Sequence, residues 1–153
     1  MPTYFAIPYE KAQELGLVAE DKPDYQVSSP AAAIAHAMAR IGQQEQEYLL
    51  VIMLNARNVM IDSVEVYHGS LTISLIRTGE VFKEAIKANA AGVIISHNHP
   101  SGDPSPSPED LAVTRNLVEA GRLLDIPVLD HVIVSASGKS VSMREQGMGF
   151  GEK

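Results

Sequence analysis

The chain has 153 residues and a mass of 16.5 kDa, a size that fits one domain. Its composition, 45% hydrophobic and 20% charged, is typical of a folded globular protein and excludes a disordered chain. The absence of cysteine excludes a disulfide framework, a thiol nucleophile, a cysteine-ligated zinc site and an iron–sulfur cluster.

The net charge and the length of the apolar runs limit which partners and which cellular location we expect. The formal net charge is −7, from 12 Lys and Arg against 19 Asp and Glu. Nucleic-acid binding usually needs a cationic face, so the charge disfavours nucleic acid as a partner. The longest apolar run, residues 48–54, is too short to span a bilayer. The N-terminus lacks the basic and apolar regions of a secretory signal. We therefore expect a cytoplasmic protein without a membrane partner, and its oligomeric state stays open.

The chain divides into three parts on its local composition. Residues 1–27 form an irregular lead-in with a turn cluster at 21–24. The main domain is predicted over residues 28–148, and residues 149–153 form a short tail. Ser29 is a good helix N-cap and Pro30 suits the first helical position. The helix that they begin has its apolar residues on one face and stops at a glycine: Ile34, Met38, Ile41 and Gly42.

Strands and helices then follow in a mixed order. Two strand-like runs joined by a four-residue turn predict a β-hairpin. A third strand-like run, a helix, a short buried strand that ends in polar residues, a second helix and a further strand come after it. This order predicts a single α/β or α+β layered domain. The runs are, in chain order, 48–54, 59–67, 71–76, 79–89, 93–96, 107–124 and 127–134.

The segment that carries chemistry is the loop after the short buried strand. Alternate residues of a strand share a face, so His97 and His99 project together and could chelate one cation. A catalytic zinc ion takes three protein ligands and keeps one position open. Without cysteine the third ligand must be His, Asp or Glu, and Asp110 lies across a loop that four prolines stiffen. These three residues plus water would form an open hydrolytic site.

Each part of this pattern also has a structural interpretation. Residues 107–110, Ser-Pro-Glu-Asp, are a typical helix start, in which Ser107 and Asp110 are capping residues. A His-x-His pair alone is weak evidence of a metal site. The joint pattern, His-x-His-Pro followed after six residues by Ser-x-x-Asp, is much more specific.

This joint pattern resembles the JAMM (MPN+/JAB) metalloprotease motif, and the amino-acid sequence of the segment is similar to that of the RadC-like branch of the family. The resemblance extends from about residue 28 to residue 148 and includes Leu129-Asp130-His131 downstream. It implies a cytidine-deaminase-like three-layer α/β sandwich, a mixed sheet with helices on both sides. The helix–hairpin–helix region of longer RadC proteins is absent from this sequence, so we expect a stand-alone catalytic domain.

The resemblance also implies roles for individual residues. His97, His99 and Asp110 would ligate one Zn²⁺ per chain, and Ser107 would hydrogen-bond the developing oxyanion. The family's upstream glutamate, which acts as general base, is matched to Glu65; the alternative reading of Glu65 is a solvated strand residue. Asp62, on the opposite strand face, is a weaker substitute.

The remaining histidines have structural readings. His131 is expected to be a buried imidazole hydrogen-bonded near Asp130, or to lie just behind the metal site. His36 and His68 are expected on the surface or on strands rather than at a metal.

The expected function is that of a zinc-dependent metallopeptidase or isopeptidase. A metal-activated water would attack an amide carbonyl, with Glu65 as general base. The partner would be a protein or peptide substrate of unknown identity. Two alternatives stay open: a nucleic-acid role associated with DNA repair, and a non-catalytic MPN interaction module. A zinc deaminase is excluded because that chemistry needs a Pro-Cys-x-x-Cys motif.

Overall fold

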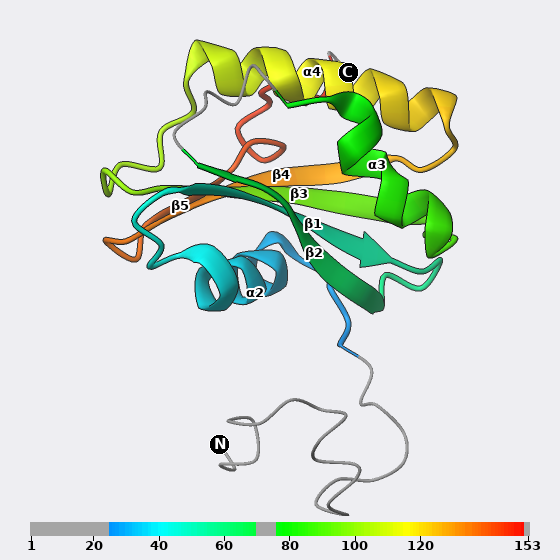
Figure 1. The fold of residues 1–153 in the computed structure, drawn as a ribbon, viewed down its shortest axis with the longest axis horizontal. Helices are drawn as coiled ribbons and strands as arrows, with labels where there is room; N and C mark the ends of the chain where they lie inside the picture. The colour runs from blue at the N-terminus through cyan, green and yellow to red at the C-terminus, as the bar shows by residue number, and fades with distance from the viewer. Residues whose placement is uncertain (1–24, 70–75, 152–153) are drawn as a thin grey trace, which may run out of the picture.

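The computed structural model describes residues 25–69 and 76–151 (Figure 1). Within these ranges the chain forms five strands in one sheet, in the order β2-β1-β3-β4-β5, and three helices. The β3–β4 pair is parallel and the other pairs are antiparallel, so the sheet is mixed. The elements are α2 (Pro30–Ile41), β1 (Glu47–Leu54), β2 (Met60–Gly69), α3 (Thr78–Lys87), β3 (Gly92–His99), α4 (Pro108–Leu123), β4 (Val128–Ser135) and β5 (Ser140–Ser142).

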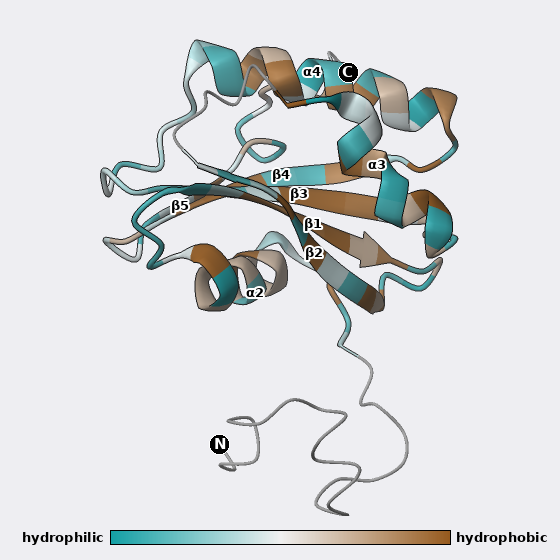
Figure 2. Cartoon of the chain, viewed as in Figure 1, coloured by the Kyte–Doolittle hydropathy of each residue, from teal (hydrophilic) through white to brown (hydrophobic). Residues whose placement is uncertain are grey.

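The helices cover both faces of the sheet. Helix α2 packs on one face, and α3 and α4 lie on the other (Figure 1). This arrangement confirms the predicted three-layer α/β architecture. The hydrophobic residues concentrate on the strands between the helical layers (Figure 2).

Strand β1 supplies apolar side chains to both cores. Its residues alternate, so Leu50 and Ile52 face α2 while Leu49 and Val51 face α3 and α4. All four are at most 1% exposed. Burial of each such side chain contributes about 1.5–3 kcal/mol, so β1 stabilises both layers of the core.

Most predicted elements agree with the structure. Helix α2 begins at Ser29, whose hydroxyl accepts from the Ala32 amide, and the hairpin turn is held by Asn55. The predicted strand at 71–76 lies outside the described residues apart from its last position, and so does most of the lead-in. The chain enters the fold slightly before residue 28, because Val27 is buried and Gln26 bridges Val59.

The β3–α4–β4 crossover positions the polar loop. Strand β3 lies in the middle of the sheet and is buried along its length except at His99. Helix α4 begins beyond the carboxyl end of β3 and returns the chain to the parallel strand β4. Ligands of α/β proteins bind outside the carboxyl ends of such strands, which is where the predicted metal ligands lie.

Candidate metal centre

Three predicted ligands converge at the end of β3. The Nε2 atoms of His97 and His99 lie 2.8 Å apart. Each lies 3.2 Å from a carboxylate oxygen of Asp110, His97 from Oδ1 and His99 from Oδ2. The side chains of His97 and Asp110 are 2% and 3% exposed, and that of His99 is 13% exposed. The structure thus brings together the two strand histidines and the helix carboxylate as a cluster that could hold a metal ion.

The start of helix α4 fixes the direction of Asp110. The Ser107 hydroxyl accepts from the Asp110 amide at 3.1 Å, and Asp110 Oδ2 accepts from the Ser107 amide at 2.8 Å. This reciprocal capping box uses two helix amides that would otherwise lack partners. The capping interpretation of Ser107 is therefore confirmed. It does not compete with the ligand interpretation of Asp110, because the cap leaves Oδ1 free to face His97.

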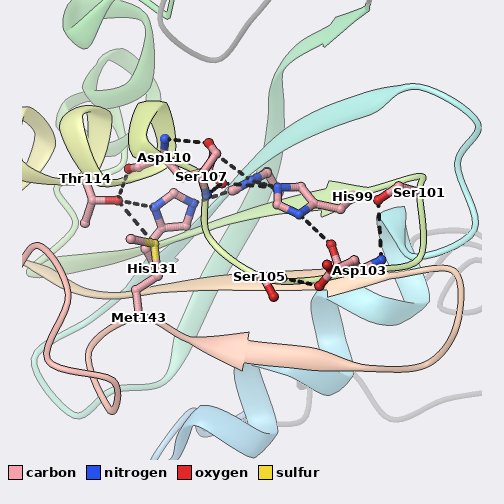
Figure 3. Close-up of polar contacts among 10 residues, drawn as sticks. His99, Ser101, Asp103, Ser105, Ser107, Asp110, Thr114, His131 and Met143 are labelled. Carbon is pink, nitrogen blue, oxygen red and sulfur yellow. Dashed lines mark hydrogen bonds and ion pairs between the residues drawn. The ribbon is translucent and has the colours of Figure 1, made fainter.

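The rigid loop after β3 fixes the ring of His99. Nδ1 of His99 lies 2.9 Å from the carbonyl oxygen of Asp103 (Figure 3). The Asp103 side chain in turn accepts from the Ser105 amide at 2.9 Å. A carbonyl can only accept, so Nδ1 carries the proton and Nε2 presents its lone pair to the cluster.

Electrostatics inside the cluster favour a charged carboxylate. Burial alone would raise the pKa of Asp110, but hydrogen bonds to His97 and His99 hold it well below its usual range. Burial alone would likewise lower the pKa of His99, but Asp110, the Asp103 carbonyl and the charge of Glu47 together raise it. The site therefore keeps a buried anion beside two imidazoles, a combination suited to a cation.

A second layer of polar groups lies behind His97. His131 is fully buried, and its Nε2 lies 2.7 Å from Nδ1 of His97. Its Nδ1 lies 2.6 Å from the Thr114 hydroxyl, which donates to the Asp110 carbonyl at 2.7 Å (Figure 3). Burial lowers the pKa of His131 well below its usual value. The reading of His131 as a residue behind the site agrees with these contacts. Its ring is not bonded to Asp130, which accepts instead from the His131 backbone amide.

An open cleft of about 320 Å³ borders the cluster. It is lined by Glu47, His99, Pro100, Ser101, Ser107, Glu109 and Asp110. Glu47 begins β1, and its face of that strand also carries Leu49, which pairs with His97. Continuing the β1–β3 register by two residues sets Glu47 opposite His99. A half-buried carboxylate therefore lies beside the cluster and also faces the cleft.

The structure does not bring Glu65 to this cluster. Glu65 pairs with Leu50 on the α2 face of the sheet, and its Oε1 lies 3.6 Å from the Arg40 guanidinium. His97 lies on the other face, in register with Leu49. A slip between Leu49 and Leu50 in the β1–β2 pairing sets Glu65 opposite Leu50, whereas Val64 and Val66 pack against the core on the other face. Glu65 is 36% exposed, so the alternative reading as a solvated strand residue describes it better.

Ser107 has a position compatible with both of its predicted roles. Its oxygen accepts the helix amide, and its hydroxyl proton has no acceptor among the described residues. Ser107 also lines the cleft. The cap therefore uses the oxygen and leaves the proton available to a ligand in the cleft.

The sequence profile of the RadC-like JAB domain matches residues 27–148. The chain belongs to that family. It is 49% identical over 142 residues to a UPF0758 protein of Roseiflexus castenholzii, a match that covers 91% of this chain and 60% of the relative. A UPF0758 protein of Caldanaerobacter subterraneus is 41% identical over 145 residues, covering 93% of the chain and 62% of the relative.

The relatives are longer than the matched region, and their names do not identify a function. The RadC-like JAB chain spans about three fifths of the length of the curated relatives that it matches. The names of these relatives state no activity. Among the described residues, no helix is long and apolar enough to cross a membrane.

Proposed function

We propose that this RadC-like JAB domain is a zinc-dependent amide hydrolase, a peptidase or isopeptidase with its reaction centre at His97, His99 and Asp110. The observation that carries the proposal is the convergence of their ligand atoms, all within 4.8 Å of one another, next to an open cleft. Two neutral imidazoles, one carboxylate and an open side are the donor set of a catalytic rather than a structural zinc site.

Two of the three ligand separations are close to those of a tetrahedral zinc site. Ligands about 2.0 Å from a tetrahedral zinc ion lie about 3.3 Å from each other. The two nitrogen–oxygen separations are 3.2 Å, and the nitrogen–nitrogen separation is 2.8 Å. Because His99 carries its proton on Nδ1, its Nε2 offers a lone pair to an ion. The residues therefore fit the metal that the family implies.

The chemistry divides between the ion and the chain. Zinc, when bound, supplies a Lewis acid for the carbonyl and lowers the pKa of water from 15.7 to about 7. Glu47 takes a proton from the attacking water and delivers it to the leaving amine, the role first assigned to Glu65. The Ser107 hydroxyl donates to the oxygen that gains negative charge. Glu47 is favoured over Glu65 because it lines the cleft beside His99.

The first test is the metal content of the protein. Protein purified without chelators should contain about one zinc ion per chain by elemental mass spectrometry. His97→Ala should lose it. A wild-type chain that holds no zinc, even after zinc is offered, would favour the non-catalytic interaction module instead.

The second test separates the two glutamates. With a fluorogenic peptide library as substrate, Glu47→Gln should abolish turnover while zinc stays bound, since the amide cannot accept a proton. Glu65→Gln is the matched control, the same change on the other face of the sheet, and should leave turnover unchanged. The opposite result would return the general base to Glu65. Salt-sensitive binding of DNA without peptide cleavage would favour the nucleic-acid role.

A further inference from the structure

The two histidines of the cluster differ in how their protons are fixed. His99 donates to a backbone carbonyl, which cannot donate in return. His97 faces another imidazole, His131, at 2.7 Å. Two neutral imidazoles can share a proton in either direction, so this contact alone does not determine which nitrogen of His97 binds a metal.

The direction is determined further along the chain of contacts. The carbonyl oxygen of Asp110 lies 2.7 Å from the Thr114 hydroxyl and can only accept, so the single hydroxyl proton of Thr114 points at it. Thr114 must then accept from Nδ1 of His131, 2.6 Å away. The weaker contact of Thr114 with the Met143 sulfur, at 3.4 Å, would use the same proton and leave the same acceptor.

The remaining protons follow in order. A neutral imidazole carries one N–H, and that of the fully buried His131 is on Nδ1, facing Thr114, so its Nε2 is an acceptor. Nδ1 of His97 must therefore donate to it, and Nε2 of His97 presents a lone pair toward Asp110 and His99. The Nε2 atoms of His97 and His99 lie 2.8 Å apart, so a metal ion placed there could accept both lone pairs.

We infer that Thr114 and His131 are positioning residues that hold His97 in the tautomer able to ligate a metal through Nε2. This inference rests on the proposed metal site and adds to it the residues that prepare the site before the ion arrives. The relay starts at the backbone of Asp110, so helix α4 supplies one ligand and also sets the proton on another. Without it, the reversed relay would place a proton on Nε2 of His97 and block binding.

The test uses two substitutions at one position. Thr114→Val removes the hydroxyl at nearly constant volume, whereas Thr114→Ser keeps it. Competition with a chromophoric chelator should show zinc affinity reduced by about 10–100-fold in Thr114→Val, the usual effect of losing such an outer partner. Thr114→Ser should bind close to wild type. Equal affinity of Thr114→Val and wild type would overturn the inference.

A second measurement needs no substitution. Nitrogen-15 NMR of the histidine rings in the metal-free wild type, at about pH 8 where free imidazoles are neutral, reports each tautomer directly. The proton should be on Nδ1 in both His97 and His131. A proton on Nε2 of His131 would overturn the inference even if Thr114→Val fails to fold.

The two proposals fail in different ways. If wild-type protein binds no zinc, the proposed function fails, while the NMR spectra still decide the tautomers. If wild-type protein binds zinc but its rings carry the opposite tautomers, only the relay is wrong. A purely structural role of Thr114 would lower the melting temperature without changing the ring spectra.

Discussion

Asn98 accepts a 2.7 Å hydrogen bond from the backbone amide of Tyr48, and so connects the strand of the two histidines to the start of β1. Its side-chain amide also donates to the carbonyl oxygens of Gln44 and Gln46, at 3.3 and 2.9 Å. These three backbone partners flank Glu47. Successive side chains of a strand point to opposite faces, so Asn98 points away from His97 and His99. The same strand therefore carries the two histidines of the cluster and the residue that holds the backbone around Glu47.

The clamp formed by Asn98 predicts a coupled loss of stability and turnover. Asn98 is fully buried, so Asn98→Ala should lower the free energy of unfolding by about 2 kcal/mol. Turnover should fall because Glu47 is no longer held, while zinc stays bound. Denaturant unfolding and metal analysis check both points. Gln43→Ala, which removes an exposed 3.3 Å bond from the same segment, is the control and should change stability by less than about 0.5 kcal/mol. Unchanged turnover in Asn98→Ala would show that Glu47 needs no such support.

The cap at Ser107 predicts a loss of metal affinity beyond its effect on stability. Ser107→Ala removes the capping oxygen and should cost about 1 kcal/mol of folding free energy. It should also weaken zinc binding by about tenfold, since the same cap directs the Asp110 carboxylate.

A second helix cap provides the control for Ser107. Ser29→Ala removes the equivalent cap of helix α2, where the hydroxyl accepts from Ala32. It should cost a similar free energy and leave zinc affinity unchanged. Equal zinc affinity in both variants would separate the cap of α4 from the metal site.

The sequence was sufficient to predict that His97, His99 and Asp110 converge, because their placement depends on local spacing. A spacing of two residues on a strand places His97 and His99 on one face, and the helix start at Ser107 places Asp110 in the first turn. The hairpin, the buried strand and both flanking helices were predicted from periodicity for the same reason. The family resemblance then supplied the three-layer arrangement.

The position of Glu47 and the contact between His131 and His97 depend on strand pairings that the sequence does not show. Glu47 reaches the cleft only because β1 pairs with β3, about fifty positions along the chain. Its one local signal is that it shares a strand face with Leu49 and Val51. Glu65 was assigned from the family pattern, and the slip in the β1–β2 register was not predictable. The contact between His131 and His97 likewise needs the parallel β3–β4 pair.

Zinc should stabilise the folded chain by mass action. At free zinc 100-fold above the dissociation constant, the added free energy of unfolding is about 2.7 kcal/mol. For a chain of this size the melting temperature should rise by about 5–10 °C. Thermal unfolding with zinc and after chelator treatment measures the shift. The same titration of His97→Ala should give no shift, and a shift of equal size there would place the ion elsewhere.

His36 predicts a pH dependence of stability that is separate from the metal centre. It lies on helix α2, which packs against the sheet, and its Nε2 lies 2.8 Å from the Ser63 hydroxyl. Burial, and then the charge of Arg40, lower its pKa, and Asp62 opposes them weakly. Below about pH 6.5 the unfolded chain therefore binds a proton at His36 more readily than the folded chain does. Stability contributed by this site is complete above that pH and falls as the pH drops toward the folded-state pKa.

The comparison of wild type with His36→Gln isolates this effect. Denaturant unfolding of chelator-treated protein between about pH 7.5 and 5.5 should show wild type losing stability relative to the variant as the pH falls. Contributions from His99 and His131 are common to both proteins and cancel in the difference. Zinc affinity at the higher pH should be the same in the two, since His36 lies on the α2 face of the sheet. Parallel stability curves would mean that His36 titrates alike in the folded and unfolded chain.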